Sequence, residues 1–382
     1  MLSACIVLAA ELSGALYSAQ KQNASLPASW VVELYGRNLV PPRLIPPAPH
    51  SSKGRVLSLS RCVAKSKHNH ASQIKMVAQY FGDPGDEKLG RLEKTLEMLQ
   101  EAHLWDASYL RSFCNVQIWE GDLPRCASTD LAYSFKPNDS ECNTLPIPSQ
   151  IMASARAKEE ELAYSRDILD PKFGGDYEIA CEAMRNASRL APNSSKVGWA
   201  GKCGHHQNSQ RHQLAEIGKR FPNQMDIRCN HHNLTLFDMV LKWKYFVDVE
   251  GTGTGYSGRL PMLLRSGRLL FYVDRKQEQW FMAFFEAWEH YVPVRSDLSD
   301  FIKNLNWVNS NPDEARRMTL AGVERANAVL TRDAAIHFTN GLFNGRWLSK
   351  FKCNKDAHDV CSNSPTTPNA VYAGSKSVWI IR

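Results

Sequence analysis

The pattern of hydrophobic and polar positions is most informative in the second half of the chain. Tyr245–Val249 alternates aromatic, branched and polar residues, which predicts a buried strand. Leucines then recur at helical spacing over residues 260–264, with Pro261 in the first turn and Gly267 just past the end. Leu269–Val273 is apolar throughout and predicts the next strand. The stretch therefore predicts a strand–loop–helix–strand unit.

The loop of this unit is rich in glycine, with Gly251, Gly253 and Gly255. Ser257 is the candidate N-cap of the helix, and Arg259 lies near its start. A helix that begins after such a loop directs unpaired N–H groups and its dipole at an anion, and a diphosphate would suit it. The alternative is a plain turn in which glycine only permits tight geometry. Because the stretch is neither a Walker loop nor a clean dinucleotide fingerprint, the spacing leaves both interpretations open.

Helices and strands alternate on both sides of this unit. The pattern predicts a strand at Phe113–Trp119 and another at His290–Val294. Helices are predicted at Asp86–Trp105, Ile151–Asp167, Tyr177–Leu190, Gln210–Lys219 and the aromatic-rich Gln279–Trp288. Further helices are expected after the capping candidates Ser296 or Asp297, Asn311 and Thr331. This alternation predicts an α/β protein with parallel sheets in both halves.

Length and composition suggest two domains. A chain of 382 residues with 43% hydrophobic residues can bury a sizeable core. We expect a leader and linker over 1–60, a first domain over 61–192, a second over 193–341 and an irregular C-terminal tail over 342–382. The formal charge of +7 is spread along the chain, so it supports nucleic-acid binding only weakly. The basic excess suits an anionic nucleotide-sugar at least as well.

Cysteine usage and glycosylation sequons favour the secretory pathway. The ten cysteines form no CxxC pair, which disfavours a structural zinc site. Sequons occur at Asn23, Asn138, Asn186, Asn193 and Asn233. Together these features favour a protein of the endoplasmic reticulum or Golgi lumen, or a secreted one, with some disulfides. Cys114 with Cys126 and Cys353 with Cys361 are local pairing candidates, but the spacing does not fix the connectivity.

The first stretch, MLSACIVLAAELSGALYSAQ, is partly apolar but lacks a basic n-region. A weak signal peptide, an ordinary helix and a truncated start all remain open. We expect no membrane-spanning segment, because no later run reaches about 18 uninterrupted apolar residues.

Two longer motifs carry a family resemblance. They are VDVEGTGTGYSGRLPMLLRSG and the run His290–Val294 followed by Asp297–Asp300. Over about 198–330, and more loosely back to 113, the chain resembles glycosyltransferase family 90, which includes protein O-glucosyltransferases and capsule-associated xylosyltransferases. The resemblance implies the GT-B architecture, with two facing Rossmann-like domains and the active site in the cleft. The first domain would bind the acceptor and the second the nucleotide-sugar.

The resemblance also assigns donor-site residues. Those that match the family pattern are Gly201, Arg211, Glu250, Gly251, Ser257, Gly258 and Arg259. Ala200 departs from it, because Arg or Lys is usual at that position, and Lys202 is a candidate substitute. Without the resemblance, Arg211 would be read equally well as a solvated helix residue.

On the acceptor side, the resemblance makes Asp122 the presumed catalytic base. Inverting transfer needs a carboxylate that removes the acceptor hydroxyl proton. The alternative is that Asp122 caps a turn before Pro124, and Glu120 is the substitute base. Ser134 and Phe135 match segments that would line the acceptor cleft.

The predicted function is therefore inverting, metal-independent transfer of glucose or xylose from a UDP-sugar to a hydroxyl of a protein or glycan. No cofactor and no metal are expected; the histidine pairs at 205–206 and 231–232 are expected on the surface. One alternative is a degenerate relative that binds a glycan or nucleotide-sugar without turnover. The other is a basic scaffold or nucleic-acid-binding protein, whose binding would depend strongly on salt.

Overall fold

The computed structural model describes residues 176–203, 209–230, 234–250, 257–275 and 277–344. It also describes the strands named below that lie outside these ranges, and Met98, Pro148 and Met152. The predicted helices at Asp86–Trp105 and Ile151–Asp167, the cysteine pairs proposed above and both histidine pairs lie outside the described ranges.

The second half of the chain forms a five-stranded parallel sheet with the order β10-β9-β8-β6-β7. Its strands are β6 (Ser194–Gly201), β7 (Met225–Cys229), β8 (Trp243–Asp248), β9 (Leu269–Val273) and β10 (Val292–Val294). The helices are α6 (Tyr177–Ala187), α7 (Gln210–Arg220), α8 (Leu236–Lys242), α9 (Leu260–Arg265), α10 (Phe301–Ser310), α11 (Pro312–Val329) and α12 (Arg332–Asn344). The predicted α/β class is confirmed for this half, as is the strand–loop–helix–strand unit of β8, α9 and β9.

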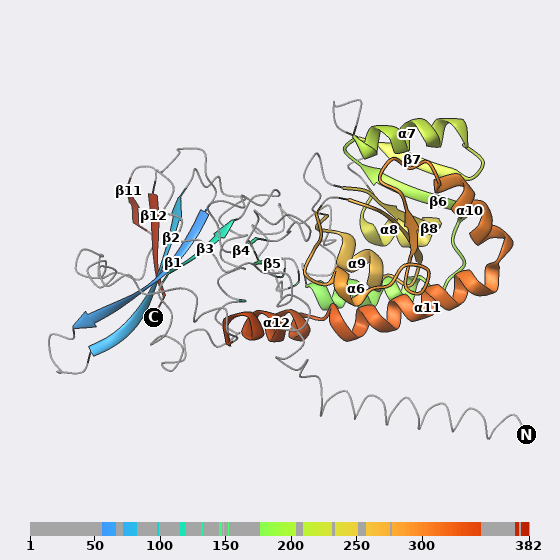
Figure 1. Ribbon diagram of the computed structural model, residues 1–382. Coiled ribbons are helices and arrows are strands. Elements are labelled where there is room, and N and C mark those ends of the chain that lie inside the picture. The colour runs from blue at the N-terminus through green and yellow to red at the C-terminus, as the bar shows by residue number, and fades with distance from the viewer. Residues whose placement is uncertain are drawn as a thin grey trace, which may run out of the picture.

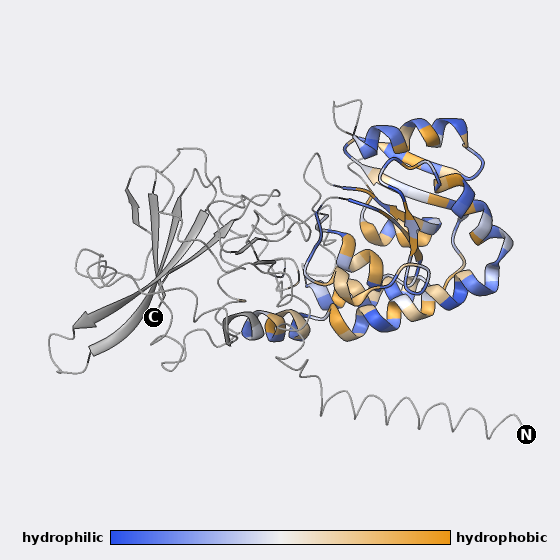
Figure 2. Ribbon diagram, in the orientation of Figure 1, coloured by the Kyte–Doolittle hydropathy of each residue, from blue (hydrophilic) through white to orange (hydrophobic). Residues whose placement is uncertain are grey.

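Helices cover both faces of this sheet (Figure 1). Helices α7 and α10 contribute Leu214, Phe301 and Leu305 to a core that also contains Val247 and Phe271 of the central strands. Helices α6, α8 and α9 lie on the opposite face, as right-handed crossovers require when the strand order reverses. Figure 2 shows hydrophobic residues gathered on the strands and on the helix faces turned toward them. The sheet is therefore buried on both sides, which explains why its strands read as nearly continuous apolar runs.

Gly198 illustrates how the sequence permits this packing. A Cβ atom at Gly198 in β6 would overlap the indole of Trp243, which lies at the start of the neighbouring strand β8. The Trp243 side chain is fully buried, and its Nε1–H donates to Oδ2 of Asp226 at 2.9 Å. Glycine at this position thus makes room for a large side chain between two central strands.

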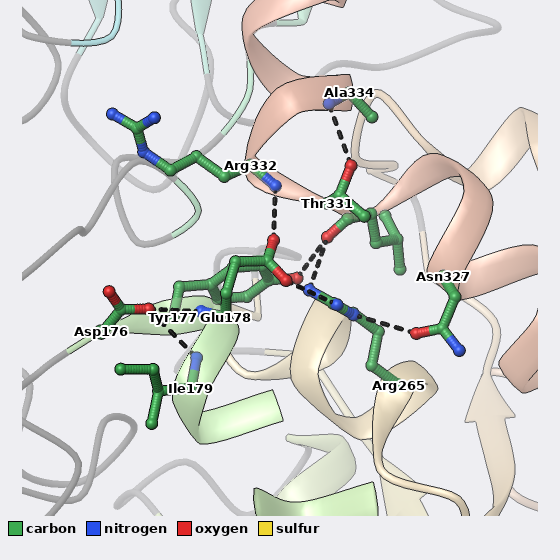
Figure 3. Close-up of polar contacts among 10 residues, drawn as sticks. Asp176, Tyr177, Glu178, Ile179, Arg265, Asn327, Thr331, Arg332 and Ala334 are labelled. Carbon is green, nitrogen blue, oxygen red and sulfur yellow. Dashed lines mark hydrogen bonds and ion pairs between the residues drawn. The ribbon is translucent and has the colours of Figure 1, made fainter. Parts of the chain in front are cut away.

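A polar network fixes the point where α6, α9 and α12 meet. Glu178 of α6 and Arg265 of α9 point toward one another (Figure 3), and Nη2 of Arg265 lies 2.7 Å from Oε2 of Glu178. The second oxygen of Glu178 accepts from the backbone N–H of Arg332 at 2.7 Å. The Tyr177 hydroxyl donates to the carbonyl of Leu330 at 2.7 Å. These bonds hold the junction between α11 and α12 against the start of α6.

Several predicted helix ends are wrong in detail. Ser257 is not the N-cap of α9: that position is Arg259, whose side chain forms no capping bond, while the Ser257 hydroxyl donates to Asp248. Asp300 precedes α10 instead of Ser296 or Asp297, and its carboxylate accepts from the backbone of Arg295. Thr331 does cap α12, since its hydroxyl oxygen accepts from Ala334 N–H.

The aromatic-rich stretch Gln279–Trp288 is not the predicted α-helix. It contains one 3-10 turn, Met282–Phe284. The ring of Trp280 lies 4.4 Å from that of Phe338 and 5.8 Å from that of Phe281. Four of its aromatic side chains are buried, namely Trp280, Phe281, Phe284 and Phe285. An irregular backbone accommodates these positions better than a helix with one apolar face.

The other described strands form a second, seven-stranded sheet. They are β1 (Val56–Lys65), β2 (Ser72–Phe81), β3 (Asn115–Trp119), β4 (Leu131–Ala132), β5 (Leu145–Pro146), β11 (Val371–Ala373) and β12 (Lys376–Ile381), in the order β11-β12-β2-β1-β3-β4-β5. Strand β3 matches the predicted strand, but only β3, β4 and β5 run parallel. Strands β1 and β2 pair antiparallel over their whole length, and β12 pairs antiparallel with β2.

This second sheet corrects two expectations. The parallel sheet predicted for the first half is a mixed sheet, because the long β1 and β2 lie close in sequence and pair directly as a hairpin. The region 342–382 was predicted to be irregular, but it supplies β11 and β12, and β1 begins at Val56, inside the predicted linker. Two facing Rossmann-like domains remain a prediction.

Candidate functional site

The candidate site lies where the strand order of the parallel sheet reverses. The chain passes from β6 outward to β7 and then returns to the other side of β6 as β8. The crossovers that follow β6 and β8 therefore leave the sheet on opposite faces. The position between the carboxyl ends of these two strands is called the crevice below. In open α/β sheets this reversal point is the usual ligand-binding position.

Two arginines meet at this point around one indole ring. Trp199 lies near the carboxyl end of β6, and the Cζ atoms of Arg211 and Arg259 each lie 5.7 Å from the centre of its ring. Arg211 comes from the first turn of α7, and Arg259 immediately precedes α9. The two helices follow β6 and β8 on opposite faces, so the fold itself brings the two cations together.

Backbone carbonyl groups hold both guanidinium groups in place. Nη1 of Arg259 donates to the carbonyl of Ala200 at 2.7 Å. Nη1 of Arg211 donates to the carbonyl of Lys202 at 2.7 Å, and its Nε donates to the carbonyl of Glu250 at 2.9 Å. Carbonyl oxygens orient a cation without neutralising it. These hydrogen bonds hold the two guanidinium groups in fixed positions.

The surroundings of Arg211 lower its pKa. Burial, followed by the nearby charge of Arg259, lowers the pKa of Arg211 to about 10. Both effects disfavour the charged form of the guanidinium. An anion bound between the two arginines would relieve this cost and so gain affinity from it.

Gly201 permits the close approach of Arg259. A Cβ atom at Gly201 would lie 2.9 Å from Nη2 of Arg259 and 2.9 Å from Cζ2 of Trp199. With glycine here, the guanidinium of Arg259 lies across the end of β6 without a steric conflict. The structure gives a physical reason for glycine at a position that the family pattern assigned to the donor site.

A buried ion pair lies at the carboxyl end of β8. Oδ2 of Asp248 lies 2.7 Å from Nη2 of Arg275, and both side chains are 1% exposed. Oδ1 of Asp248 accepts from the Ser257 hydroxyl at 2.8 Å, and the Ser257 carbonyl accepts from Gln279 at 2.9 Å. Asp248 precedes the segment 251–256 and Ser257 follows it, so these bonds tie its two ends together.

Gln210 connects the carboxyl ends of three neighbouring strands. Its side-chain oxygen accepts from Glu250 N–H after β8 at 3.1 Å. Its side-chain nitrogen donates to the carbonyl of Asp274 after β9 at 2.7 Å and to that of Ser296 after β10 at 3.3 Å. Gln210 is also the neighbour of Arg211 on α7, so the same bonds fix the helix that carries the first arginine.

The structure brings several of the predicted donor residues together. Gly201, Arg211, Glu250 and Arg259 meet at the crevice through the contacts above, and Gly258 lies in the turn before α9. Ser257 is buried and its hydroxyl is engaged by Asp248, so the structure gives it a role in support of the site. Gly251, Asp122, Ser134 and Phe135 lie outside the described residues, and their roles remain predictions.

Sequence analysis missed three supporting residues: Gln210, Asp248 and Arg275. Each of the three is buried. A charged residue at the end of an apolar strand was the available signal for Asp248 and for Arg275. It also missed a disulfide between Cys203 and Cys229, which joins the chain just beyond the carboxyl end of β6 to that of β7.

Among the residues that the structure describes there is no cluster of three or more His, Cys, Asp or Glu side chains that could hold a metal ion. In the part of the chain that the structure describes, no helix combines the length and apolar character that crossing a bilayer requires.

Comparison with known proteins adds the family. The sequence profile described as Glycosyl transferase family 90 matches residues 178–374, just over half of the chain. The chain belongs to glycosyl transferase family 90. The matched region contains every residue of the crevice described above. The resemblance inferred from the sequence motifs is thereby confirmed.

Individual relatives within this family are similar over shorter stretches. Protein O-glucosyltransferase 2 of Danio rerio is 34% identical over 111 residues, which cover 29% of this chain and 22% of that protein. Protein O-glucosyltransferase 3 of Homo sapiens is 27% identical over 188 residues, 44% of this chain and 36% of that protein. The chain thus matches well under half the length of either relative.

Proposed function

We propose that this family 90 member is an inverting glycosyltransferase that moves glucose or xylose from a UDP-sugar to a hydroxyl of a protein or glycan. The observation that carries the proposal is the pair Arg211 and Arg259, held around Trp199 at the strand reversal. A diphosphate is the part of a UDP-sugar that such a pair would recognise. The names of the relatives, protein O-glucosyltransferases, favour glucose and a protein acceptor.

In this proposal the two arginines assist departure of the leaving group. As the bond between the anomeric carbon and the diphosphate breaks, negative charge builds up on the diphosphate. Arg211 and Arg259 are already oriented by backbone carbonyls, so they can stabilise that charge with little reorganisation. The fixed positive charge would take the part that a divalent metal plays elsewhere, which makes the reaction metal-independent.

Asp122 is the proposed catalytic base. It would remove the proton from the acceptor hydroxyl as that oxygen attacks the anomeric carbon, and the configuration at that carbon would invert. Ser134 and Phe135 would line the acceptor side, and Gly251 the donor side. The arrangement requires a second domain facing the parallel sheet across a cleft, as in the GT-B architecture.

The proposed setting is the lumen of the endoplasmic reticulum or Golgi. The disulfide between Cys203 and Cys229 supports an oxidising compartment. The sequons at Asn186 and Asn193 lie in the described part of the second half, and both residues are exposed there. Glycosylation at these sites is an expected consequence of passage through the lumen.

A binding-only relative is the second candidate function. The observation that favours it is Ala200, which stands where the family pattern has a basic residue and whose carbonyl accepts from Arg259. Such a protein would bind UDP-sugars without transferring the sugar.

One assay separates the two candidates. We would measure UDP release from UDP-glucose and from UDP-xylose, with EDTA present, for the wild type and for Asp122→Asn. The transferase predicts EDTA-resistant release from one donor that the substitution abolishes. Stabilisation by UDP without release would favour the binding-only relative, and neither release nor stabilisation would refute both.

A further inference from the structure

A second pocket opens at the opposite edge of the parallel sheet. It has a volume of about 240 Å³ and lies between the amino-terminal ends of β8 and β9 and the first half of α11. The residues that line it are Lys244, Tyr245, Gly267, Arg268, Leu269, Pro312, Ala315, Arg316, Thr319 and Leu320. Because β8 rises about 3.3 Å per residue, Lys244 is roughly 20 Å from Glu250, so the pocket is separate from the crevice at the carboxyl ends.

The charged residues that line this pocket are all positive. Lys244, Arg268 and Arg316 line it, and none of its described lining residues carries a carboxylate. Arg268 is fixed there, since its guanidinium donates to the carbonyls of Val240 and Leu190 at 3.0 Å each. Burial lowers the pKa of Arg268, so its charge is costly while no anion is near. Three cationic residues, from the starts of two strands and from a helix, thus line one small pocket.

One of the lining residues, Tyr245, carries a buried hydroxyl group. Tyr245 is 4% exposed and lines the pocket, and its hydroxyl has no hydrogen-bond partner among the described residues. The ammonium of Lys244 lies 4.8 Å from the centre of the Tyr245 ring. A buried polar group without a partner costs free energy, and a ligand that accepts its hydrogen bond would recover that cost.

We propose that this pocket binds a small molecule that carries a dianionic phosphate group. A tetrahedral dianion has enough oxygen atoms to contact Lys244, Arg268, Arg316 and the Tyr245 hydroxyl from different sides. Leu269, Ala315 and Leu320 offer an apolar wall for the body of the molecule. A volume of about 240 Å³ suits a phosphate with a short organic group.

Calorimetric titration of the full chain with inorganic phosphate and with glucose 6-phosphate tests this site. Saturating UDP is present, so that the crevice with Arg211 does not contribute. We expect one phosphate per chain, with affinity reduced at least about tenfold by Arg316→Gln and by Lys244→Gln. Arg317→Gln is the matched control: the Arg317 guanidinium contacts Glu314 and the carbonyl of Trp288 and does not line the pocket, so affinity should change less than about twofold.

Two further variants make the result decisive. Tyr245→Phe should weaken phosphate binding and leave the free protein at least as stable, because it removes a buried hydroxyl without a partner. Arg211→Gln should leave phosphate binding unchanged, which separates this site from the proposed donor crevice. If sulfate binds as tightly as inorganic phosphate, the pocket recognises tetrahedral dianions in general. If glucose 6-phosphate binds more tightly than inorganic phosphate, its organic group contacts the apolar wall.

Either of two results overturns the proposal. One is the absence of binding by both phosphates up to about 10 mM, a range in which even a weak site is measurable. The other is binding that Arg211→Gln abolishes and that Arg316→Gln and Lys244→Gln leave intact, which would place the phosphate in the crevice at the carboxyl ends.

Discussion

The hydroxyl of Ser257 donates a 2.8 Å hydrogen bond to the carboxylate of Asp248, and the two residues flank the glycine-rich segment on either side. The same carboxylate pairs with Arg275 at 2.7 Å in a fully buried position. The segment that the sequence marks as a phosphate loop is thus anchored to the interior of the sheet at both ends. A rigid base of this kind is what preorganised binding requires.

Loss of the Asp248 charge should destabilise the parallel-sheet domain strongly. Asp248→Asn keeps the shape of the side chain but leaves Arg275 buried without its counter-ion, a loss worth about 3–5 kcal/mol of unfolding free energy. Ser257→Ala removes only a neutral donor, so it should cost about 1–2 kcal/mol. Urea unfolding of the two variants measures both losses of unfolding free energy. Equal losses in Asp248→Asn and Ser257→Ala would contradict the burial of the ion pair between Asp248 and Arg275.

Gly201→Ala should weaken UDP binding through Arg259. The added methyl group would lie 2.9 Å from Nη2 of Arg259, so the guanidinium must leave its position against Trp199. We expect a loss of about tenfold in UDP affinity by calorimetry. The double variant Gly201→Ala with Arg259→Ala is the control. The double variant should bind UDP no more weakly than Arg259→Ala alone. If its loss of UDP affinity equals the sum of the losses of the two single variants, Gly201 acts independently of Arg259.

Asp226 should contribute stability that is lost in acid. Burial alone would raise the pKa of Asp226, but hydrogen bonds from Arg228 and Trp243 outweigh it and lower the pKa below its usual value. A lowered folded-state pKa means that the stabilisation is complete above the unfolded pKa of about 3.9 and disappears as pH falls through the folded value.

The variant Asp226→Asn tests this linkage. It should flatten the loss of stability of the domain below about pH 4, because the titrating group is gone while an acceptor for Trp243 remains. Urea unfolding followed from pH 7 down to pH 3 measures the slope. A variant with the same acid slope as the wild type would show that Asp226 is not responsible for it.

Much of the second half could be predicted because its elements carry strong local signals. Leu269–Val273 is apolar throughout and forms β9 with those bounds, and Gly267 has the positive φ of 83° expected just beyond a helix. Helix α7 was predicted at Gln210–Lys219 and extends one residue further. Burial on both faces of the sheet makes such strands continuous in sequence and therefore easy to recognise.

The supporting residues of the site were harder to predict because their roles depend on distant partners. Gln210 looks like an ordinary first-turn residue, but it bonds Asp274 and Ser296, which lie 64 and 86 positions away. Ser257 has the residue type of an N-cap, but the buried carboxylate of Asp248 engages its hydroxyl instead. Similarly, the antiparallel partner of β2 at 376–381 comes from the other end of the chain, where local sequence gives no indication of pairing.

The most direct test of the account is UDP binding by the full chain and three arginine variants, measured by titration calorimetry with EDTA present. We predict that the wild type binds UDP and that Arg211→Gln and Arg259→Gln each weaken binding by about tenfold or more. Arg295→Gln is the matched control, since this exposed cation follows β10 at the same edge of the sheet and should have little effect. Unchanged UDP affinity in Arg211→Gln and Arg259→Gln, or no UDP binding by the wild type, would contradict the assignment of the crevice as the donor site.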